Sequence, residues 1–239
     1  MNDTRKEALS SPPLDRYLAE HFLDEPEFAA LCGLSTADLS GLMEARMVPA
    51  PSYVVSRQSV LSSQVFGDLA APGSAPGRYH RREHAVWVAR ALAILAETGR
   101  ETAPDRLKGL FLTRLQAAAD ALDMAWGLPA RTRGSGWADE AWEAFLNGTY
   151  GLCAVDPGSE RGIAQKELLQ ERLVKLSGKG TRMEFTPNEA QSLLALMDAY
   201  AAATMPFSPM DYPLSSRKLL VDDLRPRLEQ ALQGERSLP

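Results

Sequence analysis

The stretch Trp142–Lys166, W-E-A-F-L-N-G-T-Y-G-L-C-A-V-D-P-G-S-E-R-G-I-A-Q-K, combines a helix end, a glycine-flanked turn and a new helix start. It carries no charge between Glu143 and Asp156. Glycines surround its Thr-Tyr pair, and glycine permits a sharp turn or a close backbone approach. Ser159 follows the Asp-Pro-Gly turn and can cap the helix that carries Lys166. We therefore expect a rigidly held junction, of the kind that often positions binding residues.

Helical patterns dominate on both sides of this junction. The stretch A-V-W-V-A-R-A-L-A-I-L-A (85–96) is apolar almost all round, which is typical of a helix in the middle of a bundle. Further helices are predicted over 103–126, 137–146, 159–176 and 215–232, and over 187–203, where Thr186 supplies the cap. The sequence therefore predicts an all-α fold with at most one small β element, near Tyr53.

The N-terminal part has the pattern of a helix-turn-helix. Asp24 can cap a helix over Glu25–Leu31, Gly33 can end it, and Ser35 can cap a second helix. The exposed positions of that second helix contain no basic residue, and residues 15–61 hold three arginines against seven acidic residues. Because Arg and Lys make most contacts with DNA, this charge pattern disfavours nucleic acid as a partner. It favours a helix-turn-helix used as a scaffold or partner surface.

A Pro/Gly-rich stretch, A-A-P-G-S-A-P-G, suggests a domain boundary. The predicted organisation is a disordered lead (1–12), a helix-turn-helix-like module (13–69), a linker (70–78) and a helical bundle domain (79–239).

Composition narrows the class of protein. The chain of 239 residues has a net charge of −5 and a pI near 5.3, so it gains little from the counterion release that drives DNA binding. Its two cysteines, Cys32 and Cys153, lie in apolar surroundings and are interpreted as reduced core thiols. We find no apolar run long enough to cross a membrane and no signal-peptide pattern. These features predict a soluble, cytoplasmic protein without a membrane partner.

The string His80-Arg81-Arg82-Glu83-His84 is the sharpest enzyme-like pattern. Two histidines four residues apart on a helix face the same way and can share a zinc ion. However, no third ligand is apparent in the sequence, and the neighbouring arginines repel a cation. His80 and His84 are therefore weak metal candidates, and we predict no cofactor.

Three stretches carry a resemblance to a known family. They are N-G-T-Y-G-L-C with its following turn and Lys166, the block Leu31–Val55 that contains L-C-G-L-S and V-P-A-P-S-Y-V-V, and F-S-P-M-D-Y-P-L-S-S-R at Phe207–Arg217. Together they resemble an uncharacterised family found in natural-product biosynthesis gene clusters. The N-terminal part is also similar to the helix-turn-helix and wing entry of mercury-resistance-type regulators. The resemblance implies a pathway context and no particular reaction.

The same stretches supply a candidate ligand site made of Tyr150, Cys153, Lys166, Asp211, Tyr212 and Arg217. These groups could line a small-molecule pocket in which Lys166 and Arg217 hold a carboxylate or phosphate. Alternatively, Lys166 pairs with Asp211 or a neighbouring acid, and Arg217 binds helix-end carbonyls. Both interpretations stay open on the sequence alone.

These observations together favour an accessory or biosynthetic protein of a secondary-metabolite pathway, which binds a small polar metabolite or a partner enzyme. The first alternative is a ligand-sensing, DNA-binding transcriptional regulator, which would act as a homodimer. The second is a metal-dependent enzyme that uses His80 and His84. The sequence leaves open whether the protein catalyses a reaction and which oligomeric state it adopts.

Overall fold

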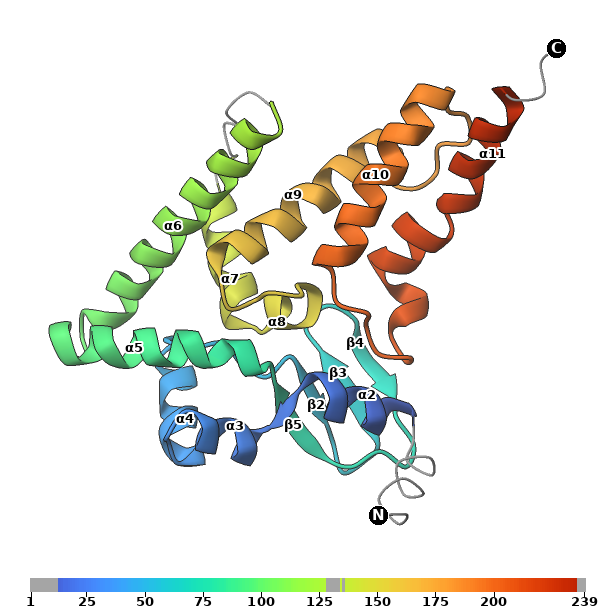
Figure 1. Cartoon of the computed structure of the whole chain (residues 1–239). Helices are drawn as coiled ribbons and strands as arrows, with labels where there is room; N and C mark the ends of the chain where they lie inside the picture. Colours follow the sequence, from blue (N-terminus) through green and yellow to red (C-terminus); the bar gives the residue numbers. More distant parts are fainter. Residues whose placement is uncertain (1–12, 128–133, 135, 236–239) are drawn as a thin grey trace, which may run out of the picture.

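The computed structural model describes residues 13–127, 134 and 136–235. Over these residues the chain forms ten α-helices and one five-stranded antiparallel sheet (Figure 1). The predicted all-α class is therefore wrong, because this sheet exceeds one small β element. The predicted disordered lead at 1–12 lies outside the described residues.

Side-chain caps set the start of several helices. The helices are α2 (Pro13–His21), α3 (Glu25–Leu31), α4 (Thr36–Glu44), α5 (Ala85–Thr98), α6 (Ala103–Ala125), α7 (Trp137–Leu146), α8 (Thr149–Cys153), α9 (Glu160–Leu176), α10 (Pro187–Ala203) and α11 (Arg225–Glu235). Short helical turns lie at η1 (Arg82–His84), η2 (Tyr212–Leu214) and η3 (Lys218–Asp222). The predicted caps Asp24, Ser35, Ser159 and Thr186 are confirmed, since each accepts a backbone N–H from the following turn.

The sheet runs in the order β1-β5-β2-β3-β4, with β1 (Leu23–Asp24), β2 (Tyr53–Val55), β3 (Val60–Ser63), β4 (Gly67–Ala70) and β5 (Gly77–His80). Strands β2, β3 and β4 form a meander, and β5 returns to pair with both β2 and β1. Tyr53, Val55 and Leu61 face inward and are buried. The predicted linker at 70–78 connects β4 to β5 within this one sheet, and the domain boundary proposed there stays a prediction.

The sheet cannot be predicted from the sequence pattern because its strands are very short. They span two to four residues, so the alternation of apolar and polar positions barely repeats. Their residues include Ser, Gly and Asp, which are depleted in strands and common in loops. Burial of a few side chains against α2 and α8 stabilises pairing that local propensity does not favour.

Helices α3 and α4 contact each other across a tight turn at Gly33, whose φ is 70°. Helix α3 has the predicted bounds and α4 begins directly after the predicted cap Ser35. The specific likeness to mercury-resistance-type regulators stays a prediction. Phe28 of α3 and Leu39 of α4 are buried in the same core cluster as Trp87 of α5 and Phe111 of α6. The N-terminal helices and the bundle therefore share one core.

Helix α8 lies where the parts of the molecule meet (Figure 1). Its Tyr150 belongs to the core formed with α5, α6, α7 and α9, while Leu152 and Cys153 belong to a second core with α2 and the sheet. A third core joins α9 to α10 and α11. The junction that stands out in the sequence is thus central in the structure.

Candidate functional site

Two glycines hold α8 close to its neighbours. Gly148 precedes α8 with a φ of 83°, and a Cβ on it would lie 2.8 Å from the backbone oxygen of Pro51. A Cβ on Gly151 would lie 2.8 Å from Nε2 of His84 and would also overlap Ser52 Oγ. These positions need glycine because the groups they approach are backbone and buried side chains. The two glycines therefore allow α8 to pack closely against the segment before β2 and against His84.

Arg81 clamps the end of α8. Its side chain is buried, and its guanidinium donates to the carbonyl oxygens of Val155 at 3.0 Å, Ala154 at 3.3 Å and Gly151 at 3.4 Å. These bonds satisfy carbonyls that a helix end leaves without partners. The sequence does not predict this role, because a buried arginine carries no local signal and Arg81 stands out only as part of a possible metal motif.

The six predicted site residues occupy three different environments. Tyr150 lines a cavity, which is described below. Cys153 and Lys166 are buried near each other. The other three, Asp211, Tyr212 and Arg217, lie in or next to the irregular segment that follows α10.

Lys166 pairs with the neighbouring acid. Its side chain is 5% exposed, and Nζ lies 2.9 Å from Oε1 of Glu167. Burial acts to lower the pKa of Lys166, but the Glu167 carboxylate, with Cys153 and Tyr200 nearby, raises it above its ordinary value. Burial in turn raises the pKa of the Cys153 thiol, so this cysteine stays protonated and is a poor nucleophile.

Asp211 and Arg217 attach the segment after α10 to the rest of the molecule. The Tyr53 hydroxyl donates to Oδ2 of Asp211 at 2.6 Å, which ties that segment to β2. Burial raises the pKa of Asp211 above its ordinary value. Arg217 donates to the carbonyl oxygens of Ala201 at 2.7 Å and Thr204 at 2.9 Å, at the end of α10. The Arg217 contacts match the helix-end alternative that the sequence left open, whereas the bond between Tyr53 and Asp211 was not expected from the sequence.

Tyr212 packs against the second core, which also contains Leu152 and Cys153 of α8. Its hydroxyl donates to Oδ2 of Asp222 at 2.6 Å. This bond links the turn η2 to η3 within the same C-terminal segment. Tyr212 does not belong to the cavity lining that contains Tyr150.

The two metal candidates, His80 and His84, are buried inside the fold. The ring of His80 stacks on Phe28 with centroids 4.8 Å apart, and its Nε2 lies 3.3 Å from Oε2 of Glu25. Burial lowers the pKa of His80 to about 4 and that of His84 well below 6.5. Among the described residues, no group of three His, Cys, Asp or Glu side chains could hold a metal ion.

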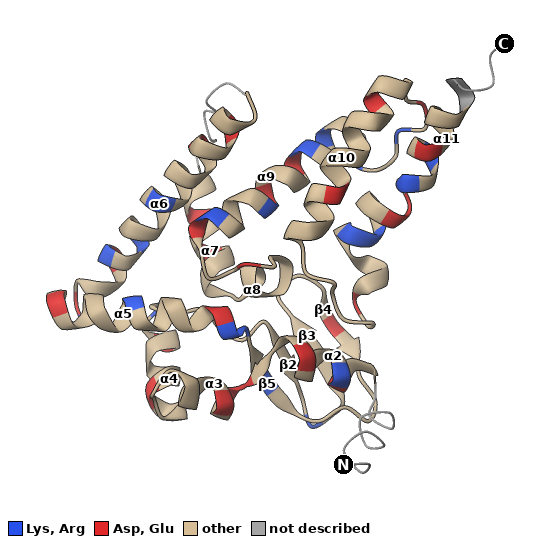
Figure 2. Ribbon diagram, in the orientation of Figure 1, with Lys and Arg blue, Asp and Glu red and all other residues tan. Residues whose placement is uncertain are grey.

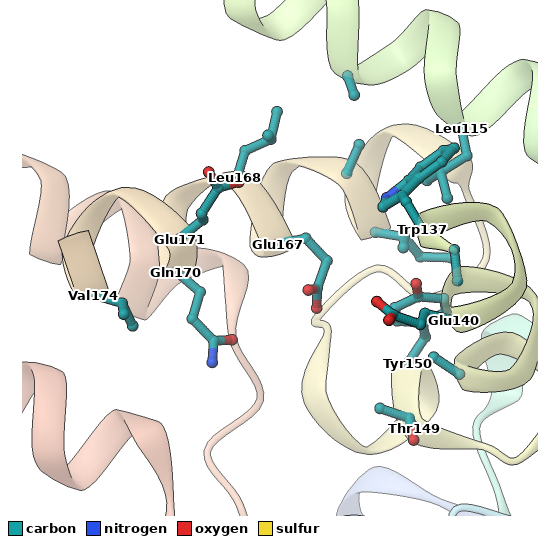
Figure 3. Close-up of a pocket in the computed structure, with 15 residues that line it drawn as sticks. Leu115, Trp137, Glu140, Thr149, Tyr150, Glu167, Leu168, Gln170, Glu171 and Val174 are labelled. Carbon is teal, nitrogen blue, oxygen red and sulfur yellow. The ribbon is translucent and has the colours of Figure 1, made fainter. Parts of the chain in front are cut away.

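A cavity of about 420 Å³ opens between α6, α7, α8 and α9 (Figure 3). Its inner wall is apolar, with Leu115 from α6 and Ile163 and Leu168 from α9. Two aromatic residues, Trp137 and Tyr150, come from α7 and α8. The remaining lining residues are Ala119, Glu140, Ala141, Ala144, Thr149, Ala164, Glu167, Gln170, Glu171 and Val174.

The polar part of the cavity is acidic. Glu140 extends from α7 and Glu167 from α9 toward the same space (Figure 3), and Glu171 lies one turn further along α9. No Lys, Arg or His belongs to the lining as far as the described residues define it. Neither Lys166 nor Arg217 lines this cavity, so neither is placed to hold an anion there.

The sequence reasoning missed most of this lining. Gln170 and Glu171 follow Glu167 by three and four residues on α9, so each is a neighbour of Glu167 one helical turn away. That spacing was available in the sequence, but polar residues at helical spacing usually form a solvated face. The cavity appears only when α7 and α8 pack opposite α9, and that arrangement has no local signal.

The charge pattern of α3 and α4 is the feature on which the prediction about nucleic acid rests. Neither helix contains Lys or Arg, and Figure 2 shows acidic residues on both. Phosphate contacts rely mainly on basic side chains, and a nucleic-acid partner disfavoured on this ground stays a prediction.

Comparisons with known proteins identify a family whose function is unknown. None of the described helices is both long and apolar enough to span a membrane. Neither the curated proteins nor the solved structures contain a match to this chain. A family model described as "Family of unknown function (DUF6058)" matches residues 107–229, from α6 into α11, which is just over half of the chain. The matched region includes α9 and all of the residues that line the cavity. The chain belongs to this family of unknown function.

Proposed function

We propose that this protein binds a small metabolite in the cavity between α6 and α9, and that it is an accessory or biosynthetic protein of a natural-product pathway. The observation that carries the binding proposal is the cavity itself. Its volume of about 420 Å³ falls within the range of small-molecule sites. It combines an apolar wall with a few polar groups, as ligand sites commonly do.

The surrounding structure favours a preformed site. The ring of Tyr150 is fixed because α8 is held by Arg81 and by the close approach at Gly148. Glu167 is anchored by its pair with Lys166. Side chains that are held in place lose less entropy when a ligand arrives, which improves affinity.

Filling the cavity tests the binding proposal. Ala144 lines it and is only partly buried, so an Ala144→Phe variant should fold and occupy part of the space. We expect wild type to show thermal stabilisation by some members of a defined library of small metabolites, and Ala144→Phe to lose that response.

Ala138→Phe is the matched control, because Ala138 is also partly buried on α7 but does not line the cavity. This variant should respond as wild type does. A response that is equal in wild type and Ala144→Phe would contradict binding at this cavity.

The pathway context rests on the sequence resemblance described above. Deletion of the gene should abolish or reduce the product of the neighbouring cluster, as measured by mass spectrometry of culture extracts. Re-introduction of wild type should restore the product, and Ala144→Phe should not. If wild type and Ala144→Phe both restore the product, the protein's role in the pathway does not depend on ligand binding in this cavity.

A further inference from the structure

The chemistry of the cavity lining points to a ligand that donates hydrogen bonds. Glu140, Glu167 and Glu171 present carboxylates, which accept hydrogen bonds. Gln170 Oε1 is buried and has no hydrogen-bond partner among the described residues. The hydroxyl of Thr149 already donates to Oδ1 of Asn147 at 2.7 Å, which leaves its oxygen as an acceptor.

An unpartnered buried acceptor is informative because it is costly. Leaving such a group without a donor costs about 1–3 kcal/mol. A donor supplied by a ligand or a water molecule would remove that penalty. A positively charged donor would also be attracted by the carboxylates that line the same cavity.

Two carboxylates define where such a charge would lie. Glu140 forms no ion pair with any other residue that the structure describes, and it points into the same space as Glu167 (Figure 3). Glu167 is held from behind by Lys166, which does not line the cavity. Lys166 therefore orients the Glu167 carboxylate, and its own side chain does not occupy the cavity beside Glu140.

The rest of the lining indicates what the charge is attached to. Leu115, Ile163 and Leu168 offer an apolar wall that would bury hydrocarbon. Trp137 and Tyr150 offer aromatic surface, which attracts both apolar groups and organic cations. A bare metal ion would leave this surface unused.

We propose that the cavity binds a protonated amine carried on an apolar or aromatic body, with the ammonium group between Glu140 and Glu167 and the body against Leu115 and Ile163. This inference rests on the proposed function and specifies its ligand class. It predicts that a carboxylate or phosphate ester of the same size is rejected, which is the opposite of what Lys166 and Arg217 suggested in the sequence.

Three probes of nearly equal size separate charge from shape. They are 2-phenylethylamine, 2-phenylethanol and 3-phenylpropanoate, each titrated into the full chain by calorimetry at pH 7. We expect the amine to bind at least about 10-fold more tightly than the alcohol, which corresponds to about 1.4 kcal/mol, and the carboxylate not to bind. Added salt should weaken the amine and leave the alcohol unchanged.

Glu140→Gln is the decisive variant. Because Glu140 is exposed and has no ion pair among the described residues, its replacement should leave the melting temperature unchanged. We expect amine affinity to fall about 10-fold while alcohol affinity stays the same. Glu97→Gln, an exposed position on α5 outside the cavity, is the matched control and should bind the amine as wild type does.

The outcomes distinguish this inference from the proposed function. If amine and alcohol bind equally and Ala144→Phe abolishes both, the cavity is a ligand site but the amine inference is wrong. If the carboxylate binds best, or if Glu140→Gln leaves amine affinity unchanged, the inference is also overturned. If none of the three probes binds, the inference fails, and the metabolite library alone decides the proposed function.

Discussion

At the scale of single residues, burial decides what each titratable group does. His80 and His84 look like metal ligands in the sequence, yet both rings are buried in the fold. Lys166 keeps its charge although it is buried, because Glu167 beside it, with Cys153 and Tyr200 nearby, raises its pKa. Asp211 is buried, and its carboxylate accepts a hydrogen bond from Tyr53. Sequence motifs name residue types, but burial and partners set their chemistry.

The buried histidines predict a loss of stability in acid. The folded chain holds the pKa of His80 at about 4, whereas an unfolded chain titrates near 6.5. As pH falls from 6.5 to about 4, the unfolded state binds a proton that the folded state does not, so the free energy of unfolding decreases. The expected slope is about 1.4 kcal/mol per pH unit for each such histidine.

Urea unfolding at several pH values measures this slope. His80→Gln should show a shallower decrease between pH 6.5 and 4 than wild type, even if it is less stable at pH 7. Identical slopes in the two proteins would show that the folded state does not depress the pKa of His80.

At the scale of elements, helices were predictable and strands were not. The caps Asp24, Ser35, Ser159 and Thr186 give four of the helices a start that a short sequence window can recognise. Strands of two to four residues offer no such window, and they form because distant segments bring their partners. The cavity follows the same rule, since its lining comes from four helices and only Tyr150 among the predicted site residues reaches it.

Two glycine substitutions should change stability in opposite directions. Gly151→Ala places a Cβ against His84 and Ser52, so we expect a loss of about 1–3 kcal/mol. Gly41→Ala, inside α4, meets nothing within 4 Å, and alanine is the better helix former. It should gain about 0.5–1 kcal/mol.

The midpoints of urea unfolding compare the two substitutions within one background. Equal effects of Gly151→Ala and Gly41→Ala would mean that α8 has room to move away from the sheet. The clamp formed by Arg81 would then be less important than its hydrogen bonds suggest.

At the scale of the whole molecule, the shared core argues for one cooperative unit. Phe28 and Leu39 from the N-terminal helices pack in the same cluster as Trp87 and Phe111 from the bundle. Strand β5 pairs with β1 and β2 and leads through η1 directly into α5. Unfolding either part would expose apolar surface of the other.

Differential scanning calorimetry tests this cooperativity. We expect a single transition whose calorimetric and van't Hoff enthalpies agree. Two separable transitions would instead support the domain boundary that the Pro/Gly-rich stretch at 70–78 suggests.

The strand order of the sheet also constrains how the chain matures during synthesis. Strands β2, β3 and β4 are consecutive, so this meander can form as soon as its residues leave the ribosome. Strand β1 is made earlier, but its partner is β5, and Leu23 lies opposite His80. Strand β1 therefore stays unpaired until β5 has been synthesised, and α3 cannot pack against β5 until His80 has been translated.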